Sequence, residues 1–462
     1  MPSNARPVSD PATSPSDKTQ FPPGLHNAFL FAAFNALSFP IVCGSPMILY
    51  AKTLGASATV LGIIAGMMPL LTVFQIPAAS HLGRVGYKRF VYAGWGMRVM
   101  FIVGLALVPL LSAVLEPTAR LALVLLLLGA FNLSRGISSC AWLPWITTLV
   151  PEQVRGKYLA RDAACVNLAS FAIIVLSACV LGERPSSLQF MALFILSAAA
   201  GGVSLIFLKR IPDVEVPEEA RRNVNEPVPW RAIAEHPPFR RLLRVNIAWP
   251  LAVGGLSAFT TAWLKAEGGL SEAHVLFVTS AAFLGGLSSL WLLGPRLDHL
   301  GSRPVLMLCM TTWVLIAAGW LALAGHVLQP TLPILLALQF LMGLTAALAN
   351  MANVRLAMAI IPVMGRDHFF ALYSVVGSLA MGVSPILWGV LIDALRGLNF
   401  DWHGLGINRY SLFFAAVALV FSVTFGFCQR LEEPKAASME ALLREILIES
   451  PQRVWVRLWP KE

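Results

Sequence analysis

Arg135 is the residue with the clearest chemical potential, because it lies inside a long apolar stretch. Residues 119–146 are mostly apolar but contain Arg135 among Asn132, Ser134 and Ser138. A guanidinium offers paired N–H donors to a carboxylate or phosphate, and no Asp or Glu lies near the middle of any apolar stretch. We expect Arg135 to face an internal cavity and to contact an anionic ligand group. A structural arginine, hydrogen-bonded between helices, is the alternative.

Asparagines in other apolar stretches are further candidates for binding a solute. Polar side chains are costly inside a bilayer, so they face a cavity, a partner or another helix. An interhelical hydrogen bond remains the alternative for each of them. With Arg135, the predicted binding residues are Asn35, Asn132, Asn246, Asn350 and Asn353.

Motifs for catalysis, metal binding and ATP binding are missing from the chain. There is no HExxH, GxSxG or GxxxxGK[ST] sequence, which argues against an enzyme and against a built-in ATPase. The six cysteines are scattered within or beside apolar stretches and form no CxxC pair. We therefore predict no catalytic residues, no metal site and no cofactor.

Twelve apolar stretches account for most of the chain and position these polar residues. The composition is 57% hydrophobic and 13% charged, with a mean hydropathy of +0.72, and such values are typical of a membrane protein rather than a soluble one. We predict an all-α membrane protein whose twelve transmembrane helices form two six-helix pseudo-repeats. The expected spans are residues 26–51, 57–80, 89–114, 119–146, 157–181, 188–208, 241–264, 272–294, 304–325, 331–361, 367–395 and 410–429.

Basic residues predict the orientation of these spans. If both termini are cytoplasmic, most of the 34 Lys and Arg residues fall on the inner side, as the positive-inside rule requires. Two lie within spans, Arg98 and Arg135. The outer loops hold only Lys52, Arg120, Arg184, Lys265, Arg396 and Arg409. The net charge of +10 is thus explained without nucleic-acid binding.

Polar segments divide the chain into five regions. We expect a disordered tail at residues 1–25, a six-helix bundle at 26–208 and a cytoplasmic linker at 209–240. A second bundle follows at 241–430, and a cytoplasmic tail at 431–462. The linker contains many prolines and mixed charges, which suits a solvated connection.

The loop after the second span of each half carries related residues. The first-half loop contains Arg84, Gly86 and Lys88, and the second-half loop contains Asp298, Gly301 and Arg303. These loops resemble the Gly-x-x-x-Asp-Arg-x-Gly pattern of the major facilitator superfamily, although Gly83 replaces the first Asp and His299 the second Arg. The resemblance implies that these six residues act in a cytoplasmic gate. A basic loop that only sets topology is the alternative.

The same resemblance implies a function. Members of this superfamily are secondary transporters that work by alternating access, and their first, fourth, seventh and tenth helices line a central cavity. We therefore expect a monomeric, multi-pass carrier of the cell (inner) membrane whose partners are a small-molecule substrate and the lipid bilayer. Because of Arg135, an organic anion is favoured over a neutral sugar or drug. A non-transporting receptor or regulator with the carrier fold, or a polytopic membrane enzyme, remains open.

Overall fold

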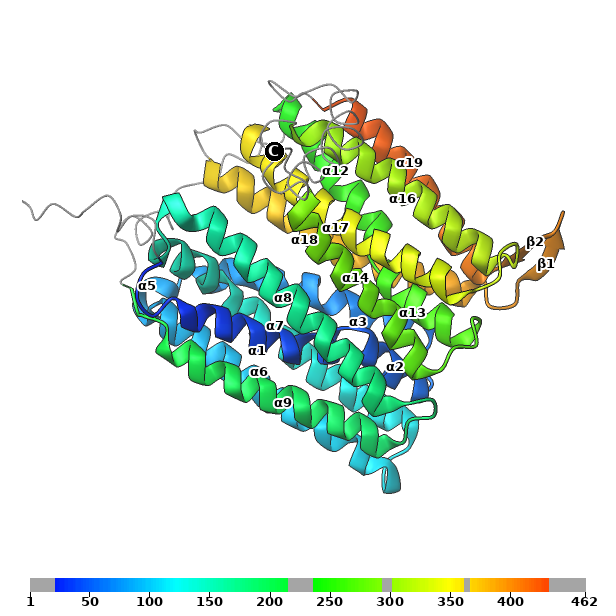
Figure 1. Cartoon of the computed structure of the whole chain (residues 1–462), viewed down its shortest axis with the longest axis horizontal. Helices are drawn as coiled ribbons and strands as arrows, with labels where there is room; N and C mark the ends of the chain where they lie inside the picture. Colours follow the sequence, from blue (N-terminus) through cyan, green and yellow to red (C-terminus); the bar gives the residue numbers. More distant parts are fainter. Residues whose placement is uncertain (1–20, 215–235, 293–300, 361–365, 432–462) are drawn as a thin grey trace, which may run out of the picture.

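The computed structural model describes residues 21–214, 236–292, 301–360 and 366–431 as a bundle of long helices. Twelve helices in the described chain are long and apolar enough to cross a membrane. The helices run roughly along one direction, with the N-terminal half in blue to green and the C-terminal half in green to red (Figure 1). The predicted class, an all-α membrane protein with twelve spans, is confirmed.

Each half contributes six spans, and every predicted stretch overlaps an observed helix. Much of the expected N-terminal tail, linker and C-terminal tail lies outside the described residues. The elements of the N-terminal half are α1 (His26–Cys43), α2 (Ser45–Thr53), α3 (Ala58–Leu71), η2 (Thr72–Phe74), α4 (Gln75–Ala79), α5 (Leu82–Val85), α6 (Tyr87–Leu107), η3 (Val108–Ala113), α7 (Pro117–Leu149), α8 (Glu152–Leu181) and α9 (Ser187–Arg210).

The C-terminal half repeats this pattern and adds a small β-hairpin that the sequence did not suggest. The hairpin joins α18 to α19, with Asn399 paired to Asn408 and Trp402 to Leu405 in antiparallel register. The elements are α12 (Pro237–Val253), α13 (Leu256–Ala266), α14 (Glu272–Leu292), α16 (Ser302–Ala324), α17 (Leu332–Ile360), α18 (Arg366–Ala394), β1 (Asn399–Trp402), β2 (Leu405–Asn408) and α19 (Arg409–Gln429).

The two ends of the bundle are distinguished by the chain ends. We call the end where α1 begins and α19 ends the proximal end, and the end that carries the hairpin the distal end (Figure 1). At the distal end, helix starts are fixed by side-chain caps. The hydroxyl of Ser57 accepts from the backbone N–H of Val60, and Asn408 forms a capping box with Ser411 at the start of α19. These caps satisfy N–H groups that the first helical turn leaves unpaired.

The predicted spans at 26–51 and 241–264 are each built from two helices that are separated at a glycine. Helix α1 ends at Gly44, which adopts an extended conformation, and α12 ends at Gly254, before Gly255 at φ +79°. In both cases a proline lies four residues before the break, Pro40 or Pro250, and its carbonyl accepts from the glycine N–H. Because the same device occurs in the first span of each half, the breaks are a shared feature of the repeat.

The most extensive contacts between the halves join α3 to α18 and α8 to α14, and α2 also contacts α13. Along α3, a Cβ at Gly62 would collide with the carbonyl of Pro385, and one at Gly66 with that of Gly382. Glycine therefore permits the backbones of α3 and α18 to approach closely, as small residues do in membrane bundles. The Gly62–Gly66 pair is a packing surface between the halves.

Candidate functional site

A cavity of about 210 Å³ lies between the two halves, beside the breaks in α1–α2 and α12–α13. Cys43 and Gly44 line it from one break, Gly255 from the other, and Met68 and Met381 from α3 and α18. On one side, the hydroxyl oxygens of Ser45 and Thr261 are 3.1 Å apart and form a hydrogen bond between the halves. The cavity thus lies where both halves end a helix and begin another.

Arg135 lies near the middle of α7, on the side that faces α1. Its guanidinium carbon is 5.2 Å from the centre of the Phe39 ring, and the thiol of Cys43, one turn further along α1, lies near it. The side chain is half-buried. Within the described segments it forms no hydrogen bond and no ion pair. Arg135 does not itself line the cavity, but Cys43, which lies near it, does.

Arg98 is a second arginine of the same region, and the sequence analysis noted it only as a charge within a span. It lies in the middle of α6 and is 4% exposed. Its guanidinium carbon is 4.6 Å from the Trp95 ring centre and 4.9 Å from that of Phe131. Phe131 precedes Arg135 by one turn of α7, so the two arginines belong to one cluster. A cation in an apolar stretch was the signal that could have identified it.

Two predicted asparagines lie in the N-terminal half with these arginines. Asn132 is buried on α7, and its amide donates to the carbonyl of Leu128, 2.9 Å away in the same helix. Its Oδ1 is buried and has no partner among the described residues. Asn35 is half-buried on α1, two turns before Cys43. Asn132 therefore retains an acceptor next to the arginine cluster.

The other three asparagines belong to the C-terminal half, and the structure does not bring them to the arginine cluster. Asn246 donates to the carbonyl of Tyr373 at 2.7 Å, which joins α12 to α18 within that half, so it makes the interhelical bond that was its alternative. Asn350 is exposed on α17. Asn353 is buried on the same helix, and its Oδ1 lacks a partner in the part of the chain that is described.

The predicted gate residues lie at the proximal end and show the internal repeat directly. Gly86 (φ +83°) and Gly301 (φ +81°) each precede the third span of their half. Two residues later, Lys88 donates to the carbonyl of Ile211 at 2.8 Å and Arg303 to that of Gln429 at 2.7 Å. Both acceptors lie at the C-terminal end of the half's last span, where a cation is favourable. Arg84 is exposed, and Asp298 lies outside the described residues.

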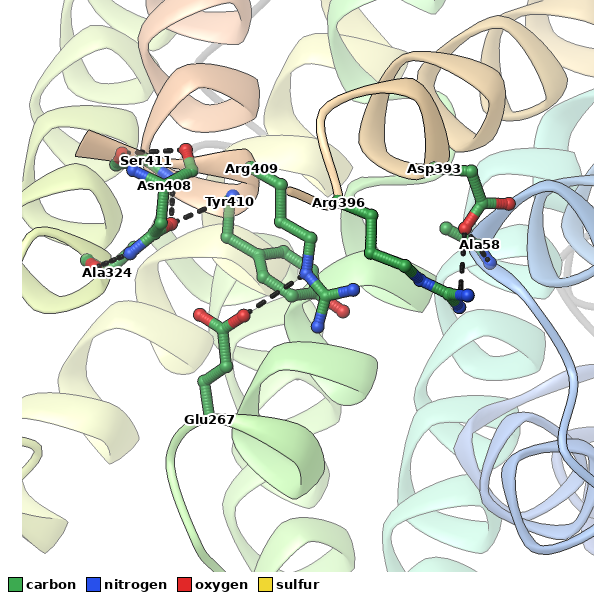
Figure 2. A network of polar contacts seen from close by, with 9 residues as sticks. All are labelled: Ala58, Glu267, Ala324, Asp393, Arg396, Asn408, Arg409, Tyr410 and Ser411. Carbon is green, nitrogen blue, oxygen red and sulfur yellow. Dashed lines mark hydrogen bonds and ion pairs between the residues drawn. The ribbon is translucent and has the colours of Figure 1, made fainter. Parts of the chain in front are cut away.

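Polar contacts gather at the distal end, where Asp393 bridges the two halves and two ion pairs lie within the C-terminal half. The carboxylate of Asp393 on α18 accepts from the backbone N–H of Thr59 at 2.7 Å, at the start of α3. It also accepts from the N–H of Ala58 at 3.1 Å (Figure 2). Arg409 pairs with Glu267 at 3.2 Å and Lys265 with Glu272 at 2.8 Å. Asp393 therefore caps a helix of the opposite half, a role the sequence analysis missed because it requires contact between the halves.

The polar groups of the interior are suited to binding a ligand. In the described segments, no group of three or more His, Cys, Asp or Glu residues is arranged to hold a metal ion. The interior contains guanidinium N–H donors beside aromatic rings. It also contains a cavity beside the breaks between α1 and α2 and between α12 and α13. Such donors in a water-poor region recognise an oxyanion.

Comparison with known protein families gives one match that covers most of the chain. The model of the Major Facilitator Superfamily matches residues 27–272 and 258–459. An uncharacterised protein from Mycobacterium bovis and one from Mycobacterium tuberculosis are 24% identical over 277 residues, covering 58% of this chain and 51% of theirs. The chain thus spans about half the length of the curated relatives it matches.

Solved structures with the same arrangement of helices include three transporters. A point mutant of the nucleoside transporter NupG has a TM-score of 0.65 at 12% identity, covering 89% of this chain and all of NupG. A D-xylose-proton symporter gives 0.67 at 12% identity, with 89% and 98% covered. The inward-open xylose transporter XylE from E. coli gives 0.66 at 14% identity, with 90% and 99% covered. At these identities, the similarity establishes the fold.

Proposed function

The chain belongs to the major facilitator superfamily, and from this premise we propose that it carries a small organic anion by alternating access, with Arg135 contacting the anion. Members of this family are secondary transporters rather than enzymes. The substrate class is the new part of the proposal. It depends on one observation, the half-buried guanidinium of Arg135 beside the cavity.

The free-energy cost of placing Arg135 within a membrane span supports an anionic ligand. An arginine at the centre of a span costs at least ~2.5–3.5 kcal/mol on insertion scales. The contact with Phe39 offsets about 0.5–2 kcal/mol of this cost. Among the described residues no carboxylate pairs with Arg135. An anionic substrate supplies the missing charge while it is bound and leaves the guanidinium available for the next cycle, whereas a fixed carboxylate would occupy it permanently.

The substrates of the structural neighbours give no guide to this choice. NupG carries nucleosides and XylE carries xylose, as their names state. An identity of 12–14% supports a shared fold but not a shared substrate. A neutral solute also leaves the charge of Arg135 uncompensated. We therefore keep nucleosides and pentoses as comparison ligands in the tests and not as the proposed substrate.

We further propose that both termini are cytoplasmic, which makes the distal end the outer face. The distribution of Lys and Arg over the loops supports this orientation. The structure then corresponds to a state closed towards the outside by Asp393 and by the Ser45–Thr261 bond. A membrane-impermeant thiol reagent applied to intact cells should fail to label cysteines placed in the 209–240 linker and should label one placed at Arg184. Labelling of the linker from outside would reverse the orientation.

Uptake into proteoliposomes tests the proposed substrate class. A panel of small mono- and dicarboxylates, phosphate esters, xylose and uridine is offered to wild-type protein and to Arg135→Lys and Arg135→Ala variants. We expect saturable uptake of at least one anion. Lysine keeps the charge without the planar fork, so uptake should fall about tenfold for Arg135→Lys and further for Arg135→Ala.

The matched control is Arg184→Ala, which removes an exposed arginine from a distal loop and should leave uptake unchanged. Wild-type affinity and rate in both Arg135 variants would refute the role of Arg135. Saturable uptake of xylose or uridine, with no uptake of any anion, would refute the proposed substrate class.

A further inference from the structure

The N–H donors of Arg98 are buried without partners. Its Nε and Nη1 are inaccessible to solvent and have no hydrogen-bond partner in the described part of the protein. The indole Nε1 of the neighbouring Trp95 is also buried and unpartnered in these segments. Donors in this condition cost free energy unless an acceptor reaches them. These donors of Arg98 and Trp95 therefore have no acceptor within reach among the described residues.

The aromatic contacts of Arg98 do not satisfy these donors. Trp95 and Phe131 have their ring centres 4.6 Å and 4.9 Å from the guanidinium carbon and attract the cation through their ring faces. Neither side chain supplies a hydrogen-bond acceptor, because phenylalanine has no polar atom and the indole Nε1–H of tryptophan only donates. Arg98 is thus held in position by aromatic rings while its donors stay available, which suits a planar, two-oxygen acceptor.

Arg98 and Arg135 lie close enough for their charges to repel. The guanidinium carbon of Arg98 lies 4.9 Å from the centre of the Phe131 ring, Arg135 lies one turn from Phe131 on α7, and Cys43 of α1 is near both side chains. Neither arginine forms an ion pair with a described carboxylate. Two like charges near each other in a low-dielectric interior are more costly than the sum of two isolated ones. One negative charge would neutralise only half of this cluster.

We propose that Arg98 is a second anion-binding residue and that the substrate of this carrier is a small dianion, a dicarboxylate or a phosphate monoester. The inference rests on the proposed function and specifies the charge of its substrate. One anionic group binds at Arg135, beside the cavity, and the second binds at the N–H edge of Arg98. A monoanion of the same size occupies the first position only.

Matched ligand pairs test this charge count on the purified full-length protein. Succinate is compared with its monoamide, succinamate, and ethyl phosphate with its methyl diester. Each pair keeps its size nearly constant and removes one charge. Binding is measured by calorimetry, and thermal stabilisation is measured in parallel, since a ligand of the folded state raises the melting temperature. We expect the wild type to bind at least one dianion ~10-fold or more tightly than its monoanionic partner.

Arg98→Gln should remove this preference and leave monoanion binding intact, and Arg98→Lys should keep part of it. Retained monoanion binding also shows that the variant is folded. The Arg184→Ala protein should behave as the wild type. An Arg98→Gln variant that discriminates dianion from monoanion as the wild type does would overturn the inference.

The remaining outcomes separate this inference from the function on which it rests. Equal binding of dianions and monoanions by the wild type would refute a dianion as the substrate. The proposal that the protein carries an organic anion would still stand. Binding of xylose or uridine, with no binding of any of the four anions, would refute both. Preference for the phosphate pair or for the succinate pair identifies which dianion the site takes.

Discussion

The two halves share one fold but place their charges in different regions. In the N-terminal half, Arg98 and Arg135 lie in the membrane interior with no carboxylate partner among the described residues. In the C-terminal half, the charges of Glu267, Asp393 and Arg409 lie at the distal end, where each has a partner (Figure 2). We infer a division of labour in which the first half holds the substrate and the second half supplies the charged groups that close the cavity.

The two halves differ in charge at one pair of equivalent positions, Arg98 in the first half and Trp313 in the second. Arg98 lies twelve residues after the helix-capping Gly86, and Trp313 lies twelve residues after Gly301. Trp313 is 2% exposed, stacks on Phe421 at 5.1 Å and contacts Trp249 at 5.8 Å. The C-terminal half therefore fills with aromatic packing the place where the N-terminal half buries a cation. The fold requires bulk at this position, and the charge is particular to the first half.

The largest expected effect comes from placing an arginine at the equivalent position of the C-terminal half. Trp313→Arg removes stacked aromatic area and buries a cation with no binding function, so we expect the free energy of unfolding to fall by ~3–5 kcal/mol. Denaturation in detergent or mixed micelles measures it. The control Trp313→Phe should cost less, because it keeps an aromatic ring. A Trp313→Arg protein as stable as the wild type would show that the halves tolerate charge equally.

The next effect concerns closure at the distal end. Asp393→Ala removes the acceptor of the Ala58 and Thr59 N–H groups at the start of α3. It should shift the equilibrium towards distal opening by ~1–2 kcal/mol, about the value of a helix N-cap. Spin-label distances between positions 184 and 328, in the distal loops of opposite halves, report this shift. In the control Asp401→Ala, the lost carboxylate accepts, among the described residues, only from the N–H of Gly404 in its own turn. Equal distance distributions in both variants would remove Asp393 from the closure.

A smaller effect separates function from stability at Arg98. Arg98→Met removes a buried charge without a carboxylate partner and keeps most of the side-chain volume. We therefore expect the ligand-free protein to be as stable as the wild type or more stable by about 1 kcal/mol, while the affinity for a dianion falls to that for a monoanion. The same denaturation assay, with and without succinate, measures both quantities. A loss of stability of more than ~2 kcal/mol, comparable to a cation–π contact, would indicate a structural role.

The smallest effects should be equal in the two halves. Lys88 and Arg303 each donate to a carbonyl at the C-terminal end of a helix, so Lys88→Gln and Arg303→Gln should each cost ~0.3–1 kcal/mol of stability. Thermal denaturation at low and high salt compares them, because salt screens this interaction. A marked difference between the two variants would show that one of these residues has a further function, such as the predicted proximal gate.

The sequence was sufficient for the features that depend on local pattern. The apolar stretches predicted the twelve spans. The positive charge of Arg135 within one of these stretches identified it as a candidate binding residue. The breaks at Gly44 and Gly254 were not predicted, although each has a proline four residues earlier. The environment of Arg98 depends on Trp95 and Phe131, which lie on two different helices. The cap from Asp393 depends on contact between the halves. Such tertiary contacts leave no periodic signal in one sequence.

Anomalous diffraction from crystals soaked in bromosuccinate tests the central claim most directly. The bromine marks the ligand without ambiguity, and the soak uses a concentration at which the ligand raises the melting temperature. We predict a bromine peak beside the arginine cluster, on the N-terminal side of the cavity, with one carboxylate at Arg135 and the other at Arg98. A peak confined to the C-terminal half, or a carboxylate bound without contact to either arginine, would contradict the division of labour between the halves.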